Sequence, residues 1–229
     1  MPAAIVDGNH NRGGIASYLG RKSTDLAHLL AVLQDVGMIT HEQDAFRRNR
    51  SAYRIAEPLL AFYHAVMRAA WGELERPGRA ANVWRRLQPT FRSKVVGPHF
   101  ERICREWTPW YSDSGTLGGI PSTVAGGTVP DPADRTAHEI DVVAFGQDET
   151  GRKQLLAIGE CKWNDVMGLG HLRRLDQVRD LLRAREGVNA ERTRLLLFSG
   201  TGFSDDRRAV ARQDPTVQPI DMTRLHTGV

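Results

Sequence analysis

Two short apolar runs in the second half of the chain each carry acidic residues, and this feature constrains the fold more than any other. The first run is Ile140–Phe145, whose second residue is Asp141. The second is Leu155–Trp163, which reads LLAIGECKW and contains Glu160 and Lys162. Compact apolar runs of this length are typical of strands buried in a sheet. A short polar stretch joins them, so the two strands are predicted to be neighbours in a hairpin.

The charged residues of these strands form one candidate site. Residues i and i+2 of a strand lie on the same face, so Glu160 and Lys162 point one way and Cys161 the other. Asp141, on the preceding strand, can then lie beside Glu160. Two neighbouring carboxylates repel unless a divalent cation joins them, and oxygen ligands suit Mg²⁺ or Mn²⁺. A lysine beside such an ion can activate water or stabilise charge on a phosphate, which is the chemistry of phosphodiester hydrolysis.

The same residues also have a purely structural interpretation. Glu160 and Lys162 can form a buried ion pair on an inert fold, while Asp141 caps the start of its strand. Glu139 could serve as an auxiliary ligand, although a solvated position is favoured for it. His138 and His171 flank the site in sequence, and structural roles are favoured for both because a lone histidine is more often structural than catalytic.

The segments around these strands predict a mixed α/β domain over 96–229. A helix is predicted from Gly97, with an apolar face and with Glu101 at the edge of that face. Its apolar residues are Phe100, Ile103, Cys104 and Trp107. The stretch 107–137 is rich in Gly, Pro, Ser and Thr, so it is predicted as a long loop with one strand near 120–124.

The remainder of this domain is predicted to alternate helix and strand. An amphipathic helix is expected over 171–185, followed by strands at 194–198 and 217–221. The residues predicted to face the core from that helix are Leu172, Leu175, Val178 and Leu182. A helix N-terminus that could hold a phosphate is a further expectation over 199–204, although a plain N-cap is favoured there.

Residues 1–56 are predicted to form a winged helix-turn-helix module. A short helix from Ile15 ends at Gly20, and a second ends at Gly37 after a run of apolar residues at helical spacing. These apolar residues are Leu26, Leu29, Leu30, Leu33 and Val36. Two short apolar strands then enclose an exposed Arg-rich loop. The segment resembles the winged-helix family, which implies that the second helix enters the major groove of duplex DNA.

The basic residues expected to contact phosphate lie in the turn and the loop of this module. They are Arg21, Lys22, Arg47, Arg48 and Arg50. The family normally has a helix before the first one predicted here, and 1–14 lacks the pattern of a helix. Residues 57–95 are predicted as connecting helices, the first with a stripe of Leu60, Tyr63, Met67 and Trp71 and the second over about 80–91. Trp71 and Trp84 are expected in the core.

Composition narrows the classes of protein. The net charge is +4, with a formal +6 on residues 1–100 and −2 on the remainder, and a basic front part favours a nucleic-acid partner. Many proteins carry such an excess without binding nucleic acid. The longest apolar runs are too short to span a bilayer, the start lacks the pattern of a signal peptide, and there are only two cysteines. We therefore expect a cytoplasmic protein with no membrane partner, disulfide framework or cysteine-rich zinc site.

The segments GPHFERICREW, HEIDVVAF, LLAIGECKW and FSGTGFS resemble the restriction-endonuclease-like PD-(D/E)xK superfamily. They are most similar to the nuclease-like domain that follows a winged helix at the C-terminus of archaeal-type AAA+ and STAND ATPases. The resemblance implies Asp141 and Glu160 as metal ligands, Lys162 as the catalytic lysine and Glu101 as a supporting acid. The ATPase domain that normally comes first is not in this sequence, so a separate ATPase chain could be a partner.

Three functions remain open from the sequence. The first is a Mg²⁺- or Mn²⁺-dependent endonuclease directed to nucleic acid, expected to be duplex DNA, by its winged helix. The second is a catalytically inactive DNA-binding regulator that keeps the nuclease fold as a dimerisation or sensing body, so a homodimer is a further candidate assembly. The third is an interaction module that works only with the separate ATPase chain.

Overall fold

The computed structural model describes residues 1–185 and 187–228, apart from the side chains at 207, 208 and 212. The chain forms two compact units. The first comprises Met1–Gln43 and Asn49–His99, and the second Asp44–Arg48 and Phe100–Val229. Across the described residues, no helix combines the length and the apolar character needed to cross a bilayer.

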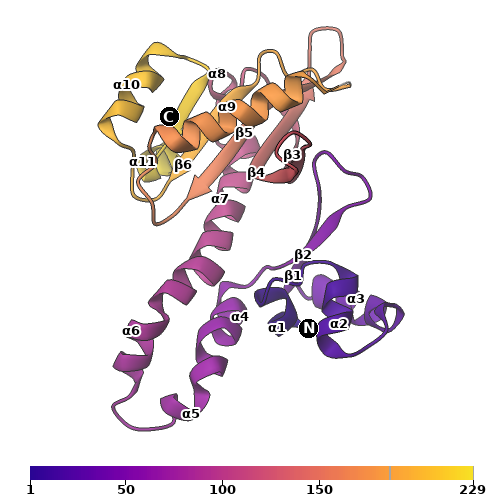
Figure 1. The fold of residues 1–229 in the computed structure, drawn as a ribbon, viewed down its shortest axis with the longest axis vertical. Helices are drawn as coiled ribbons and strands as arrows, with labels where there is room; N and C mark the ends of the chain where they lie inside the picture. Colours follow the sequence, from indigo (N-terminus) through magenta and orange to yellow (C-terminus); the bar gives the residue numbers. More distant parts are fainter. Residues whose placement is uncertain (186, 229) are drawn as a thin grey trace. The chain divides into compact units, whose positions relative to one another are not determined.

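The first unit contains a two-stranded antiparallel sheet and several short helices (Figure 1). Its regular helices are α1 (Pro2–Val6), α2 (Arg12–Leu19), α3 (Ala27–Asp35), α4 (Pro58–Phe62), α5 (Trp71–Leu74), α6 (Ala80–Phe91) and the first residues of α7 (Gly97–Trp110). Tighter or wider helical turns link them at Ser23–Leu26, Tyr63–Met67, Arg68–Ala70 and Arg92–Val96. β1 (Ile39–Gln43) pairs with β2 (Ser51–Ile55). The predicted order of two helices and a hairpin is confirmed at this level, as is the helix over 80–91.

The start of the first unit differs from the prediction. A five-residue helix, α1, precedes α2, and α2 begins at Arg12 rather than Ile15. The side chain of Asn11 accepts a hydrogen bond from Gly14 N and so caps α2, which is a local signal that apolar periodicity does not report. Gly20 ends α2 with a φ of 63°, as expected of a glycine at this position.

Several residues predicted for the core of the first unit are exposed instead. Leu29 and Val36 of the second predicted helix are 41% and 60% exposed, so α3 contributes little more than Leu30 to the core. The stripe expected over 60–71 is also wrong, because Ala61, Ala65, Val66 and Ala70 form the buried face. Trp71 and Trp84 are 47% and 39% exposed. These small buried residues allow close helix packing, which leaves the large side chains outside.

The second unit is built on a five-stranded mixed sheet with the order β3-β4-β5-β6-β7. The strands are β3 (Pro121–Asp131), β4 (Thr136–Gln147), β5 (Lys153–Lys162), β6 (Arg194–Ser199) and β7 (Val217–Ile220). The β3–β4 and β4–β5 pairs are antiparallel, whereas β5–β6 and β6–β7 are parallel. Each parallel pair is joined by a crossover helix, as parallel geometry requires. These helices are α9 (Leu169–Arg183) and α10 (Asp205–Gln213).

Helices cover both faces of this sheet (Figure 1). α9 packs on one face through the four residues predicted for it, Leu172, Leu175, Val178 and Leu182. α7 packs on the other through Phe100, Cys104 and Trp107. Because β5 is central and covered on both sides, its residues from Leu155 to Cys161 are all buried, which explains their continuous apolar run. The smaller helices α8 (Ser114–Leu117) and α11 (Met222–Thr227) complete the unit.

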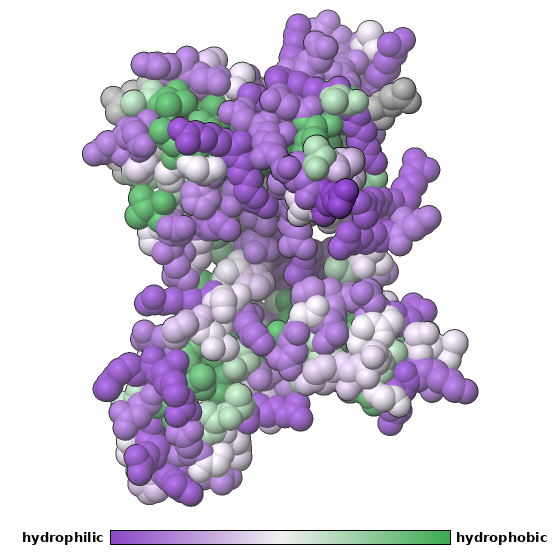
Figure 2. Space-filling view, in the orientation of Figure 1, coloured by the Kyte–Doolittle hydropathy of each residue, from purple (hydrophilic) through white to green (hydrophobic). Residues whose placement is uncertain are grey.

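The long loop predicted over 107–137 is wrong, although the strand predicted within it near 120–124 is present as the start of β3. α7 continues to Trp110, α8 follows, and β3 runs for 11 residues to Asp131. β3 is an edge strand, where Pro and Gly are tolerated because one side of the backbone needs no ladder partner. The predicted face of α7 is wrong at Ile103, which is 40% exposed. Figure 2 shows a largely hydrophilic surface with small, separate hydrophobic patches.

Candidate functional site

Asp141 lies where the pairing of β4 and β5 ends. The last ladder pair is Val142 with Gly159, and beyond it the Asp141 carboxylate accepts a hydrogen bond from Cys161 N, 2.8 Å from Oδ2. The β3–β4 pairing shifts register beside this residue, between Ala125 and Gly127. Such irregularities redirect side chains and are common next to active sites. The side chain of Asp141 thus replaces a backbone partner and is fixed close to β5.

Glu160 is buried, and three nitrogen-bearing side chains contact one of its oxygens. Lys162 Nζ lies 3.3 Å from Oε1, His171 Nδ1 lies 3.2 Å away, and Arg174 Nη1 lies 3.1 Å away. The other oxygen, Oε2, is buried without a hydrogen-bond partner among the described residues. An orphaned carboxylate oxygen is costly to bury, so it marks a position where a further cation or donor would be stabilised.

The local folding of the chain explains this gathering. Glu160 and Lys162 are two residues apart on β5 and share a face, as predicted. α9 starts seven residues after Lys162 and presents His171 and Arg174, one helical turn apart, on the same side. Arg174 also donates from Nη2 to the carbonyl oxygen of Glu139, at 2.7 Å, which ties it to β4 as well.

Electrostatics distinguish Asp141 from an ordinary surface carboxylate. Burial raises the pKa of Asp141, and the charge of Glu160 raises it further. The Cys161 N–H and the charge of Lys162 act in the opposite direction. Asp141 and Glu160 lie on neighbouring antiparallel strands, and the N–H that donates to Asp141 belongs to the residue next to Glu160.

Glu101 approaches the site from α7. Its Oε2 lies 3.9 Å from Arg105 Nη1, and the same nitrogen donates to the carbonyl oxygen of Asp141 at 3.0 Å. Arg105 therefore links Glu101 to the strand that carries Asp141. Glu139 is exposed, as favoured from the sequence, and His138 forms a separate contact with Asp131.

His171 and Arg174 are the residues of this site that sequence reasoning undervalues or misses. The sequence favours a structural role for His171, and nothing in its motifs points to Arg174. The signal that could find them is their i, i+3 spacing in the first turns of the helix that follows the Glu-x-Lys strand. A helix returning over a sheet from that strand presents its first turns near the end of the strand.

The five basic residues predicted to contact nucleic acid fall in different units. Arg21, Lys22 and Arg50 belong to the first unit and are exposed. Arg47 and Arg48 belong to the second, within a segment held by the hydrogen bond from Ala45 N to Gly126 O and by the Phe46–Phe145 ring contact. That segment is not the freely exposed loop tip expected from its composition.

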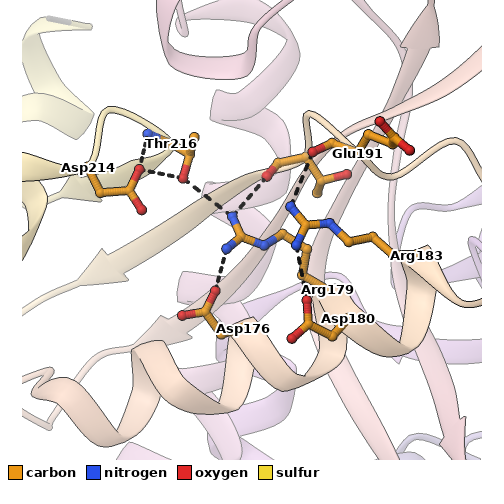
Figure 3. A network of polar contacts seen from close by, with 8 residues as sticks. Asp176, Arg179, Asp180, Arg183, Glu191, Asp214 and Thr216 are labelled. Atoms are coloured by element: carbon orange, nitrogen blue, oxygen red, sulfur yellow. Dashed lines mark hydrogen bonds and ion pairs between the residues drawn. The ribbon is translucent and has the colours of Figure 1, made fainter.

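A second polar network lies on α9, further along the helix (Figure 3). Arg179 contacts Asp176 on its own helix and reaches Thr193 O and Thr216 Oγ1 in the segments that precede β6 and β7. Arg183 contacts Asp180 and Glu191 O. These contacts attach α9 to the parallel strands and are structural in character.

A polar cavity of about 910 Å³ lies at the opposite end of β5 from Glu160. Its lining includes Asp148, Thr150, Gln154, Arg183 and Arg192. Because it is formed by the β4–β5 turn and the segment before β6, it contributes nothing to the cluster around Glu160.

The residues of the site fit a small oxygen-preferring cation. No group of three or more His, Cys, Asp or Glu side chains arranged to hold a metal occurs within the described ranges. Mg²⁺ needs fewer protein ligands, since it is commonly bound through one or two carboxylates and keeps several waters. The Asp141 carboxylate and Glu160 Oε2, which has no hydrogen-bond partner among the described residues, are the oxygen donors that such an ion would use. Compared with known proteins, the sequence matches no protein-family model and no curated protein.

Proposed function

We propose that the second unit is a metal-dependent phosphodiester hydrolase of the PD-(D/E)xK type that acts on nucleic acid. The observation that carries the proposal is the buried, unpartnered Oε2 of Glu160 beside Asp141 and Lys162. The sequence resemblance assigns metal-binding and catalytic roles to the same three residues. The order of strands and helices around them is compatible with a restriction-endonuclease-like domain.

Each residue has a role in this proposal. Asp141 and Glu160 would hold Mg²⁺ or Mn²⁺, which when bound supplies a Lewis acid for the phosphate and lowers the pKa of a bound water. Lys162 is a partly exposed cation beside Glu160, suited to orienting the attacking water and stabilising negative charge on the phosphate. Glu101 supports the strand of Asp141 through Arg105.

We further propose that the first unit is a winged-helix module that binds duplex DNA. Its helix-helix-hairpin order and the exposed Arg21, Lys22 and Arg50 support this role. The exposed side chains of α3 include the apolar Leu29 and Val32 as well as Gln34, which can form hydrogen bonds to base edges. The three exposed cations support contacts to phosphate, which are the sequence-independent part of such binding.

A second function is favoured by a different observation. Glu160 Oε1 already holds Lys162, His171 and Arg174, which is how an inert, fully neutralised carboxylate would be stabilised. In this alternative the chain is a catalytically inactive DNA-binding regulator or an interaction module. The exposed apolar residues of α3 would then contact a protein, either a second copy of this chain or a separate ATPase chain.

Incubation of the whole purified chain with plasmid, linear duplex and single-stranded substrates, in Mg²⁺, Mn²⁺ or EDTA, tests the proposal. Cleavage is expected only with the metal ion, and Glu160→Gln and Asp141→Asn should abolish it. Glu149→Gln is the matched control because it removes an exposed charge from the β4–β5 turn. Cleavage by Glu160→Gln at the wild-type rate would exclude this site, and binding without cleavage in any metal would favour the regulator.

A further inference from the structure

Arg174 contacts both the buried acid of the site and the backbone of a neighbouring strand. Its Nη1 lies 3.1 Å from Glu160 Oε1, and its Nη2 lies 2.7 Å from the carbonyl oxygen of Glu139. Two separate strands therefore position one guanidinium at the edge of the acidic site. The side chain is 38% exposed, whereas the Glu160 side chain is 4% exposed. Arg174 thus connects the buried acid with the solvent.

We infer that Arg174 is the residue that binds the phosphodiester of the nucleic-acid substrate and sets it against the Glu160–Asp141 pair. This inference rests on the proposed function of the site. A guanidinium has five N–H donors in a planar fork, of which the contacts to Glu160 and Glu139 use two. Donors remain for the paired oxygens of a phosphate, which the guanidinium matches in geometry.

The charges of the site favour this assignment over a simple ion pair. Lys162 and His171 also lie within 3.3 Å of Glu160 Oε1, so this oxygen does not depend on Arg174 for a cationic partner. If a phosphate draws the guanidinium towards itself, Lys162 and the His171 ring stay on the carboxylate. The site then offers two cations to the phosphate, Lys162 from β5 and Arg174 from α9.

Three other arginines of the second unit whose side chains the structure describes lack this combination. Arg105 is 13% exposed and is held between Glu101 and the Asp141 carbonyl. Arg179 is also 13% exposed and contacts Asp176 and Thr216. Arg183 matches Arg174 in exposure, at 39%, and lies on the same helix, but its contacts are Asp180 and Glu191 O. Arg183 is therefore the matched control for Arg174.

The test compares Arg174→Ala, Arg174→Lys and Arg183→Ala with the wild-type chain. Affinity for a short fluorescein-labelled DNA duplex is measured by anisotropy in Ca²⁺, so that cleavage is suppressed, at several salt concentrations. Arg174→Ala should weaken binding about 10-fold or more, and the slope of log affinity against log salt should become shallower by about 0.9, as for one lost phosphate contact. Arg174→Lys should restore part of both, and Arg183→Ala should change neither.

Binding of Mn²⁺ without nucleic acid and steady-state cleavage complete the test. Unchanged Mn²⁺ affinity in Arg174→Ala and a raised KM support a contact to substrate. Equal duplex affinity and salt slope for Arg174→Ala and Arg183→Ala would overturn the inference, as would tighter Mn²⁺ binding by Arg174→Ala with unchanged duplex affinity. If the wild-type chain never cleaves and only Arg174→Ala loses duplex binding, the phosphate contact is retained and the hydrolase is rejected. If the wild-type chain cleaves and Arg174→Ala has normal KM and kcat, the hydrolase is retained and the phosphate contact is rejected.

Discussion

The carboxylate of Asp141 accepts a hydrogen bond from the backbone N–H of Cys161, with Oδ2 and the nitrogen 2.8 Å apart. The ladder between β4 and β5 ends at the pair Val142 and Gly159, next to Asp141. The Asp141 side chain therefore satisfies an N–H that the β4 backbone no longer reaches. Asp141 therefore closes the ladder, and the same hydrogen bond holds its carboxylate beside Glu160. Its ionisation links the stability of the second unit to the chemistry of the site.

Asp141→Asn is expected to raise the thermal stability of the chain at neutral pH while abolishing metal-dependent cleavage. Burial is the main cause that raises the pKa of Asp141 above 3.8. A carboxyl with a raised folded-state pKa contributes stability that is fully present below pH 3.8 and is lost as the pH rises through the folded-state pKa. The amide keeps an acceptor for Cys161 N–H and carries no charge. Tm at neutral pH should rise by about 2 °C or more, and the difference should shrink in acid.

Asp148→Asn is the matched control because the shift at Asp148 has the opposite sign. Hydrogen bonds from the Thr150 side chain and the Arg152 backbone lower the pKa of Asp148. Its contribution is therefore present above pH 3.8, so removing the charge should lower Tm at neutral pH. Scanning calorimetry of both variants across pH makes the comparison. A lower Tm for Asp141→Asn at neutral pH would contradict the proposed cost of the buried charge.

Gly200→Ala is expected to destabilise the second unit by about 1–3 kcal/mol, because it forces overpacking. A Cβ at this position would lie 2.6 Å from the Trp163 ring and 2.8 Å from the Trp163 carbonyl oxygen. The backbone oxygen cannot move without shifting the end of β5, where Gly200 N also donates to Lys162 O. Urea unfolding and the cleavage assay should therefore both report a loss.

Gly170→Ala provides the contrasting substitution. Gly170 lies in the first turn of α9, and a Cβ there would have no neighbour within 4 Å. Replacing a helical glycine by alanine should stabilise the chain by up to about 1 kcal/mol. If both variants unfold at the same urea concentration, the close contact with Trp163 is not the reason for a glycine at position 200.

The central strands and α9 could be predicted from the sequence because their signals are local. β5 is covered on both faces, so its apolar run is continuous, and α9 buries one side, so its leucines recur at helical spacing. The pairing of Glu160 with Lys162 followed from strand geometry alone. The roles of these residues in catalysis stay a prediction.

The rest of the second unit depends on partners distant in sequence. β3 contains Pro121, Gly126, Gly127 and Pro130, and it forms a strand because β4 supplies its hydrogen bonds. The contacts of His171 and Arg174 with Glu160 depend on how α9 returns over the sheet, and the i, i+3 spacing of the two residues indicates only that they share a face of the helix. In the first unit, Trp71 and Trp84 stay partly exposed because alanines make the close helix contacts.

Arg179→Met is expected to lower the free energy of unfolding by about 1–3 kcal/mol, since it leaves partly buried acceptors without their donor. Arg179 contacts Thr193 O at 3.4 Å and Thr216 Oγ1 at 3.3 Å, besides Asp176, and is 13% exposed (Figure 3). Arg183→Met, at an exposed position on the same helix, should change stability by less than about 0.5 kcal/mol. Chemical denaturation of the two variants side by side measures the difference. Equal losses of unfolding free energy would show that the contacts of Arg179 with Thr193 and Thr216 do not stabilise the unit.

The β3–β4 turn is expected to make the second unit sensitive to acid. Asp131 is 3% exposed and accepts hydrogen bonds from Gln177 Nε2 and the backbone N–H of Ala133 and Asp134, with His138 Nε2 at 3.3 Å. The contact with His138 is the main cause that lowers the pKa of Asp131 below 3.8. The stability from this carboxylate is therefore present above pH 3.8 and lost as the pH falls through the folded-state pKa.

Asp131→Asn should accordingly be less stable than the wild-type chain at neutral pH, and the two should converge below pH 3.8, where the wild-type carboxylate also loses its charge. Asp134→Asn is the control, since Asp134 is exposed in the same turn and its side chain should contribute little. Urea unfolding followed by tryptophan fluorescence at a series of pH values measures the convergence. The difference in unfolding free energy between wild type and Asp131→Asn could instead stay constant into strong acid. That result would mean that the Asn side chain does not fit the turn geometry, and that the charge of Asp131 does not stabilise the turn.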